Sequence, residues 1–222
     1  MNYRSIGDIS ITVNNNLHLI PDSIDLVVGI PRSGLLAGSV IALALNVPIV
    51  TLNAYMANAE ILHGSTRSLR RSSPRFPAEA RHVLIVDDSV RSGGSMKRAV
   101  AEARSCEYPG DLLSCAVYST GKAQADVDVF LEQVPTPRAF EWNLFHTVIS
   151  ECCVDIDGVL CVDPTKEQND DGPKYREFLL NAETLMRPTC KVGMLVTSRL
   201  EKYRPETEEW LGRHQIEYDQ LV

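Results

Sequence analysis

The chain has 222 residues, 44% of them hydrophobic and 23% charged, and a net charge of −7. This composition excludes a largely disordered chain, and the length suffices for one large domain or two small ones. No apolar run approaches the ~18 residues of a membrane span, and the first residues lack the basic and apolar stretches of a secretory signal. We therefore expect a cytoplasmic protein without a membrane partner.

The surplus of acid lies in the second part of the chain. Residues 1–150 contain 13 basic and 14 acidic residues, whereas residues 151–222 contain 9 and 15. A nucleic-acid-binding domain would need a basic face, so we expect no nucleic-acid partner.

The six cysteines include the adjacent pair Cys152 and Cys153 but show no CxxC spacing. Such a pattern does not favour a zinc site or a disulfide framework. We therefore predict that the cysteines are buried small hydrophobes in a reducing compartment.

Apolar runs of strand length alternate with helical stretches, which is typical of an α/β fold with a central, mainly parallel sheet flanked by helices. In the first 150 residues the pattern predicts strands at 24–30, 48–52, 82–86, 112–118 and 126–133, and helices at 35–45 and 95–105. After residue 150 the alternation begins again, with strands at 152–155 and 192–197, helices at 174–186 and 206–214, and a strand starting at 216–218. We predict two domains, residues 1–146 and 150–222.

The periodicity fails between residues 53 and 80, where Gly, Ser, Pro and Arg accumulate. Arg67, Arg70, Arg71 and Arg75 occur there with no acid among them. A loop of this length inside a compact domain is typical of a functional lid or of disorder.

Residues 83–95 form the first candidate site: a buried strand ends in Asp87 and Asp88, and a hydroxyl-rich turn then enters a helix. The N-terminus of a helix offers unpaired N–H groups, and glycine lets the backbone approach an anion, so this turn suits a phosphate monoester. Paired carboxylates repel unless a cation or hydroxyl groups lie between them, which favours ribose hydroxyls or hydrated Mg²⁺. The alternative is an ordinary strand–helix connection with solvated acids.

The same segment resembles the signature of the type I phosphoribosyltransferases, in which two acids and three further residues precede Thr-Gly-x-Thr. Ser92 and Ser95 stand at the hydroxyl positions, and Ser89 stands where the family usually has an apolar residue. The resemblance implies that Asp87 and Asp88 are catalytic, holding Mg²⁺ and the ribose hydroxyls of phosphoribosyl pyrophosphate. It also implies a 5′-phosphate site formed by Ser89, Val90, Arg91, Ser92, Gly93, Gly94 and Ser95.

A second feature, the turn Gly29-Ile30-Pro31-Arg32-Ser33-Gly34, is similar to the pyrophosphate loop of that family. By itself such a turn is usually only a turn. The resemblance implies that Pro31, Ser33 and Gly34 bind pyrophosphate and that Arg32 neutralises it as it leaves. The 53–80 loop stands where the family has its mobile lid.

The acceptor side is less defined. Residues 137–143, with Phe140, Glu141 and Trp142, stand where the family has a variable hood. Trp142 either stacks on a base or packs at the domain junction. The resemblance implies Mg²⁺-dependent transfer of phosphoribose to a nitrogenous base or related small molecule, with release of pyrophosphate, by a homodimer.

The second candidate site, residues 154–160, resembles the first motif of the haloacid dehalogenase-like hydrolases. The resemblance implies Asp155 as nucleophile, Asp157 as general acid and both as Mg²⁺ ligands, with Thr197 as the phosphate-binding hydroxyl of a second motif. The alternative is a turn or a calcium loop.

The later motifs of that superfamily, a Lys and a last acidic pair, are not recognisable in the 25 residues after Thr197. Through residues 169–172 and 199–204 the whole chain resembles capsule-associated fusions of a phosphoribosyltransferase with such a hydrolase, and we expect a truncated second domain. Two rival hypotheses are a phosphatase acting on a phosphoribosylated or sugar-phosphate compound, and a non-catalytic regulator that binds phosphoribosyl pyrophosphate.

Overall fold

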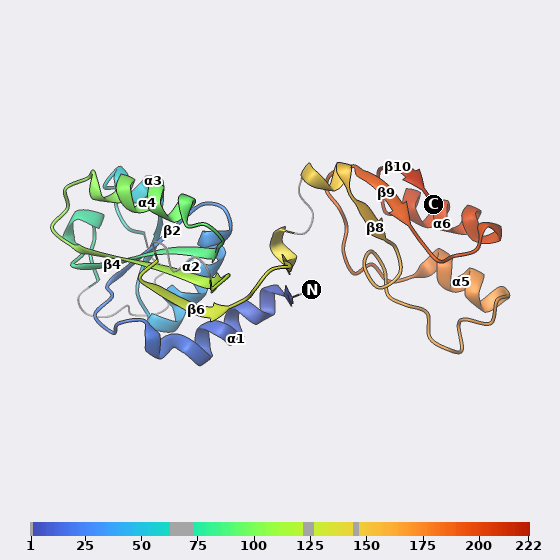
Figure 1. The fold of residues 1–222 in the computed structure, drawn as a ribbon, viewed down its shortest axis with the longest axis horizontal. Coiled ribbons are helices and arrows are strands. Elements are labelled where there is room, and N and C mark those ends of the chain that lie inside the picture. Colours follow the sequence, from blue (N-terminus) through green and yellow to red (C-terminus); the bar gives the residue numbers. More distant parts are fainter. Residues whose placement is uncertain (1, 63–72, 122–126, 144–146) are drawn as a thin grey trace. The chain divides into compact units, whose positions relative to one another are not determined.

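The computed structural model describes residues 2–62, 73–121, 127–143 and 147–222. It divides into two compact units, Met1–Trp142 and Asn143–Val222 (Figure 1). Each unit has its own hydrophobic core. The described helices are all too short or too polar to cross a lipid bilayer.

The first unit is built on a five-stranded parallel sheet. Its strands, in the order β3-β2-β4-β5-β6, are β3 (Ile49–Thr51), β2 (Leu26–Gly29), β4 (His82–Val90), β5 (Asp111–Ser119) and β6 (Val129–Gln133). All four residues of β2 are buried, as expected for a strand covered on both faces. The predicted α/β fold with a parallel sheet is confirmed for this unit.

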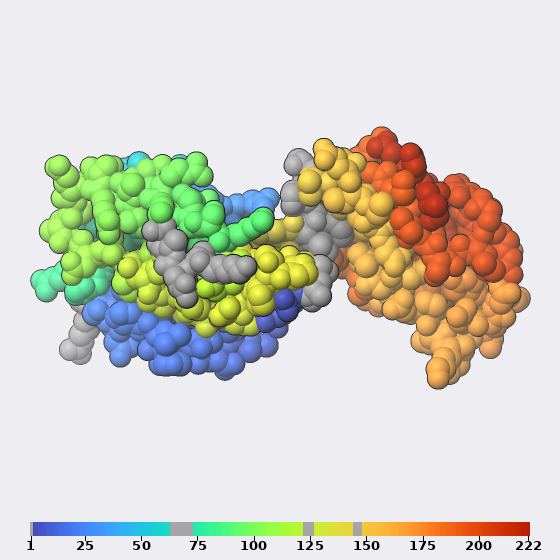
Figure 2. All heavy atoms as spheres, viewed as in Figure 1, coloured from blue at the N-terminus to red at the C-terminus, as the bar shows by residue number. Residues whose placement is uncertain are grey.

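Helices cover both faces of this sheet. On one face, α1 (Ile6–Asn16) and α2 (Ser33–Leu45) contribute apolar side chains to a core with Val27 and Leu84. On the other, α3 (Leu52–Met56) and α4 (Gly94–Arg104) pack with Leu26 and Ile85. Figure 2 shows α1, in blue, and α4, in yellow-green, on opposite sides of this unit. Alternate residues of β2 and β4 therefore feed the two cores, as the two-residue period of a strand requires.

Strand β4 is longer than predicted. It runs to Val90 because β5 continues beside it, pairing with Asp87, Ser89 and Val90. The acid pair therefore lies within the strand, and α4 begins at Gly94, one residue before the predicted start.

The expected loop at 53–80 is partly ordered. Helix α3 begins one residue before it, where the Thr51 hydroxyl accepts a bond from the Ala54 N–H at 3.1 Å, and extends into it to Met56; a 3₁₀ turn forms at Pro77–Glu79. Tyr55 and Ile61 are buried. Residues 63–72, with most of the arginines on which the lid prediction depends, lie outside the described residues.

Two short strands, β1 (Asn2–Arg4) and β7 (Arg138–Phe140), were not predicted, and neither was α1. They pair in parallel, Arg4 opposite Phe140, and we call them the β1–β7 ribbon. Ser5 and Asp8 form a capping box at the start of α1, a Ser-x-x-acid signal that could have located this helix.

The second unit has a three-stranded parallel sheet in the order β10 (Tyr218–Leu221), β9 (Val192–Val196), β8 (Cys153–Asp155). Helices α5 (Pro173–Asn181) and α6 (Arg204–Arg213) pack against each other, with Trp210 fully buried. The predicted helix at 174–186 ends early because the chain becomes extended at Ala182 and Thr184 forms a bridge with Cys161. Turns of 3₁₀ helix occur at Leu17–Leu19, Glu141–Asn143, Thr147–Glu151 and Glu201–Tyr203.

The prediction for the cysteines is wrong at the adjacent pair. Cys115 and Cys161 are buried, but Cys152 and Cys153 are exposed. Cys153 is the first residue of β8, which is at an edge of the three-stranded sheet.

Candidate functional site

The turn after β2 packs closely against the middle of β4. The Ile30 N–H donates to the Val86 carbonyl at 2.9 Å. A Cβ atom at Gly34 would lie 2.6 Å from that same carbonyl oxygen and 3.1 Å from Oδ1 of Asp87. Only a residue without a side chain permits this approach, so Gly34 sets the distance between the start of α2 and the acid pair.

Asp88 is almost fully buried, with 3% of its surface exposed. Its Oδ1 accepts a hydrogen bond from the Ser33 hydroxyl at 2.7 Å, and its Oδ2 accepts one from the Trp142 indole N–H at 2.8 Å. The Asp88 carboxylate therefore joins the turn before α2 to the segment that follows the β1–β7 ribbon. Each carboxylate oxygen has two acceptor positions, so further donors can still bind.

The neighbouring carboxyl group, Asp87, lies in surroundings that disfavour its charged form. Its Oδ1 accepts from the Asp88 backbone N–H at 2.9 Å. Burial, followed by repulsion from Asp88, raises the pKa of Asp87 to about 7. A cation or a hydroxyl donor beside this pair would relieve both effects.

The turn that enters α4 exposes backbone donors. Gly93 has a φ of 77°, which favours glycine, and it lets the chain turn from β4 into the helix. No side chain caps the first N–H groups of α4, and Arg91, Ser92 and Ser95 are exposed. This arrangement suits an anionic group at the helix N-terminus.

The turn at the start of α2 exposes Pro31 and Arg32, which are joined by a cis peptide bond. Ser33 points to Asp88, as described above. The structure thus brings Ser33, Gly34, Asp87 and Asp88 into contact.

An aromatic stack lies beside the acid pair. The ring centroids of Phe140 and Trp142 are 5.0 Å apart with planes 20° from parallel, and those of Tyr118 and Phe140 are 5.3 Å apart at 24°. Trp142 thus packs on aromatic residues of the first unit while its indole N–H points to Asp88.

Sequence reasoning missed Arg138, the first residue of β7. Its Nη2 donates to the Val90 carbonyl at 3.0 Å, and its guanidinium carbon lies 5.1 Å from the centre of the Phe140 ring. The two-residue spacing of Arg138 and Phe140 could have indicated a shared strand face.

The two carboxylates of the acid pair can supply part of the oxygen ligands that a Mg²⁺ ion needs. Carboxylate oxygens are the ligands that Mg²⁺ prefers, and it usually binds through one or two carboxylates together with substrate oxygens and water. In the described part of the chain, no three His, Cys, Asp or Glu side chains gather as a complete protein site. Asp87 and Asp88 thus suit an ion that a phosphorylated substrate helps to hold.

The second candidate site is built around an ion pair between two protein side chains. Asp157 accepts three hydrogen bonds from Arg199, the two shortest from Nε at 2.9 Å and from Nη2 at 2.6 Å, and only 1% of the Arg199 side chain is exposed. Arg199 also donates to Thr207 and contacts the Cys161 sulfur. The ion pair joins the 154–160 turn to Arg199, and the bond to Thr207 connects Arg199 to α6. The Asp157 carboxylate is thus held by a structural partner.

Asp155 and Thr197 are bound mainly by local backbone groups. Asp155 is exposed, and its Oδ1 accepts from the Ile156 N–H at 2.8 Å. The Thr197 hydroxyl accepts from the Arg199 N–H at 3.1 Å.

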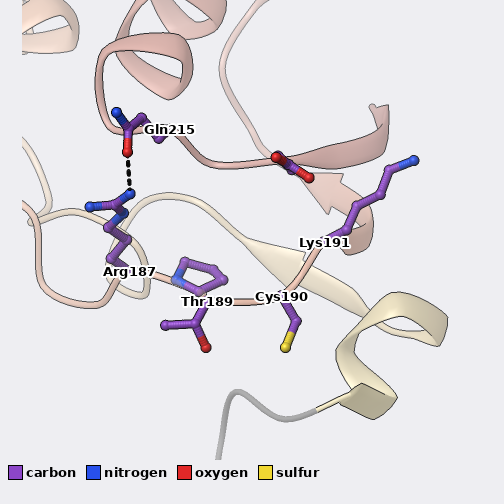
Figure 3. A pocket seen from close by; sticks show the side chains of 7 residues that line it. Arg187, Thr189, Cys190, Lys191 and Gln215 are labelled. Atoms are coloured by element: carbon purple, nitrogen blue, oxygen red, sulfur yellow. Dashed lines mark hydrogen bonds between the residues drawn. The ribbon is translucent and has the colours of Figure 1, made fainter.

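A hollow of about 750 Å³ in the second unit is lined by none of the predicted residues. Its lining is Arg187, Pro188, Thr189, Cys190, Lys191, Gln215 and Glu217. Arg187 donates to the Gln215 side chain at 2.7 Å (Figure 3). Lys191 forms an ion pair with Asp219.

Residues 2–150 match the family model described as "Phosphoribosyl transferase domain". No curated protein matches the chain. None of these findings supports the resemblance of residues 150–222 to the hydrolases or to the capsule-associated fusions.

Several solved structures are similar in fold. The xanthine-guanine-hypoxanthine phosphoribosyltransferase of Helicobacter pylori is 15% identical, with a TM-score of 0.46 over 64% of this chain and 92% of that one. A purine phosphoribosyltransferase from Pyrococcus horikoshii is 14% identical, with a TM-score of 0.44 over 66% and 97%. An orotate phosphoribosyltransferase from Aeropyrum pernix is 16% identical, with a TM-score of 0.39 over 58% and 72%. Likeness at this level does not identify a substrate.

Proposed function

The chain belongs to the phosphoribosyl transferase domain family, and on this premise we propose that it binds phosphoribosyl pyrophosphate with Mg²⁺ and transfers the phosphoribosyl group to a nitrogenous acceptor. The observation that carries the proposal is the acid pair Asp87 and Asp88, which contacts the start of α2 and precedes the uncapped turn into α4 by a few residues. In an open parallel sheet, ligands bind at the carboxyl ends of the strands.

In this proposal each turn has its own phosphate group. The segment from Ser89 to Ser95, in which Arg91, Ser92 and Ser95 are exposed, holds the 5′-phosphate at the start of α4. Pro31, Ser33 and Gly34 bind the pyrophosphate, and Arg32 neutralises its charge as it leaves. Asp87 and Asp88 hold the ribose hydroxyls between the two.

The chemical step breaks the bond from C1′ to pyrophosphate and forms one to a nitrogen of the acceptor on the opposite face. The protein positions the two reactants, stabilises the departing anion and excludes water. Mg²⁺ at Asp87 and Asp88 would neutralise charge on the leaving pyrophosphate. The raised pKa of Asp87 fits this role, because a cation or hydroxyl partner supplied by the substrate complex would stabilise its charged form.

The test is calorimetric titration of the full chain with phosphoribosyl pyrophosphate and Mg²⁺. We expect the double variant Asp87→Asn with Asp88→Asn to bind at least about tenfold more weakly, since two charged partners are removed. The matched control is Glu102→Gln with Asp111→Asn, two exposed acids of the same unit. Equal affinity in the folded double variant and the control would contradict the proposal.

For the second unit we propose no phosphatase activity. The ion pair of Asp157 with Arg199 supports this view, because a general acid must be free to give its proton to the leaving group. A regulator that binds phosphoribosyl pyrophosphate without turnover is the alternative, and steady-state release of pyrophosphate distinguishes it. The homodimer, the lid and a role in nucleotide metabolism or capsule biosynthesis stay predictions.

A further inference from the structure

The guanidinium of Arg138 lies over the end of the strand that carries the acid pair. Its Nη2 donates to the carbonyl of Val90, the last residue of β4 and two residues beyond Asp88. Its other side faces Phe140, a member of the aromatic stack that continues to Trp142. Arg138 thus links the β1–β7 ribbon to the candidate site.

One donor group of this guanidinium is unused. Nη1 is buried and has no hydrogen-bond partner within the described ranges. The nearby Asp88 carboxylate accepts hydrogen bonds from Ser33 and Trp142 but not from Nη1. Burial lowers the pKa of Arg138. The negative charge of Asp88 partly opposes this shift, and the positive charge of Arg91 adds to it.

A buried cationic donor without a partner is costly, and such groups in native proteins call for an explanation. If Arg138 were purely structural, its bond to the Val90 carbonyl and its contact with the Phe140 ring would suffice, and neither of them uses Nη1. A ligand oxygen is the partner that would complete the guanidinium.

We propose that Arg138 selects the acceptor by donating from Nη1 to a carboxylate or other anionic oxygen carried by its ring. The inference rests on the proposed function and adds the class of acceptor: a nitrogen heterocycle with an acidic oxygen substituent, rather than a neutral or amino-substituted one. The aromatic stack of Phe140 and Trp142 provides the apolar wall beside which such a ring would lie.

The 5′-phosphate of phosphoribosyl pyrophosphate is a second possible source of an anionic oxygen. The bond to the Val90 carbonyl places Arg138 beside the residues assigned to the 5′-phosphate, and the contact with Phe140 places it on the aromatic stack. The acceptor is favoured because the turn before α4 already supplies exposed donors to the phosphate, and the dissociation constant of phosphoribosyl pyrophosphate measured without acceptor distinguishes the two sources. An arginine fork also matches the planar geometry of a carboxylate.

The experiment compares matched acceptors that differ in the acidic oxygen: orotate with uracil, nicotinate with nicotinamide, and xanthine with hypoxanthine. Initial rates with saturating phosphoribosyl pyrophosphate and Mg²⁺ give kcat/KM for each member of a pair. The full chain is compared with Arg138→Gln, with Arg138→Lys and with the control Arg98→Gln, an exposed arginine of α4.

For at least one pair we expect the native protein to prefer the acidic member by about tenfold or more. Arg138→Gln should bring this ratio close to one, Arg138→Lys should keep part of it, and the control should keep all of it. A ratio within one protein does not depend on how much of that protein is folded. The dissociation constant of phosphoribosyl pyrophosphate with Mg²⁺, measured without acceptor, should stay within about twofold in Arg138→Gln.

Three results would overturn the inference. They are a ratio that Arg138→Gln leaves unchanged, a loss of phosphoribosyl pyrophosphate affinity in that variant, and use of none of the acidic probes by protein that binds phosphoribosyl pyrophosphate. Failure of the native protein to bind phosphoribosyl pyrophosphate at all would instead contradict the proposed function.

Discussion

Replacing Asp87 by Asn should stabilise the metal-free protein at alkaline pH while weakening its binding of phosphoribosyl pyrophosphate. The folded protein holds this carboxyl group beside Asp88 and away from water, which raises its pKa to about 7. The Asn side chain keeps an oxygen that accepts from the Asp88 N–H, a bond of 2.9 Å in the native protein. The change therefore removes the charge and leaves the local hydrogen bond.

The size of the effect follows from linkage between protonation and folding. The pKa of Asp87 rises from 3.8 to about 7 on folding, which corresponds to at most about 4 kcal/mol at ~1.36 kcal/mol per pKa unit. Because the folded state holds the proton more tightly, the native protein loses stability as pH rises from about 4 to about 7, and the loss is complete above that window. The variant has no such loss, so the difference is small near pH 4 and largest near pH 8.

Hydrogen exchange of the amides of β4 and β5, followed by mass spectrometry in the presence of EDTA, reports the stability of the first unit separately from the second. Protection in Asp87→Asn should exceed that of the native protein at about pH 8 and approach it at about pH 5, after correction for the intrinsic rates. Glu102→Gln, which removes an exposed acid from α4, should follow the native protein at both values. Equal or lower protection of Asp87→Asn at the higher pH would refute the reasoning.

Further variants test the packing around the site. Gly34→Ala should destabilise the first unit by about 1–3 kcal/mol in urea denaturation, because its Cβ would lie 2.6 Å from a carbonyl oxygen. The control Gly212→Ala should not destabilise the second unit, because its Cβ would have no neighbour within 4 Å. Trp142→Phe keeps a stacked ring but loses the indole bond to the acid pair, so hydrogen exchange should show a loss of about 1–2 kcal/mol; unchanged protection would mean that the bond contributes nothing. Arg199→Gln leaves the partly buried Asp157 carboxylate without its guanidinium partner and should cost the second unit about 1–3 kcal/mol on thermal unfolding. Phosphate release from sugar phosphates and nucleotides should stay at background in both the native protein and Asp155→Asn, and turnover that the variant abolishes would show an active second site.

The sequence predicted the parts of the first unit that are local. Strand-length apolar runs and the glycine-rich turns located β2, β4, α2 and α4 within a few residues, since these signals depend on nearest neighbours. The acid pair and the two turns could therefore be named before the structure was known.

What could not be predicted depends on contacts between distant residues. Asp88 binds Ser33 and Trp142, which are 55 and 54 positions away, and no pattern in the sequence encodes such pairs. The end of β4 is set by its neighbour β5. Likewise, the three residues of β1 are too few to show a period, and they form a strand only because β7 lies beside them.

The β1–β7 ribbon has a consequence for the order of folding during protein synthesis. Residues 2–4 pair with residues 138–140, so the first strand to leave the ribosome has no partner until nearly the whole unit has been made. The five-stranded sheet, whose β2 to β4 contacts span far fewer residues, can form earlier, because contacts between distant residues pay a larger loop-closure cost. The Arg138 side of the site is therefore the last part of the first unit to be completed, and a nascent chain stalled before residue 138 would carry the acid pair without its arginine.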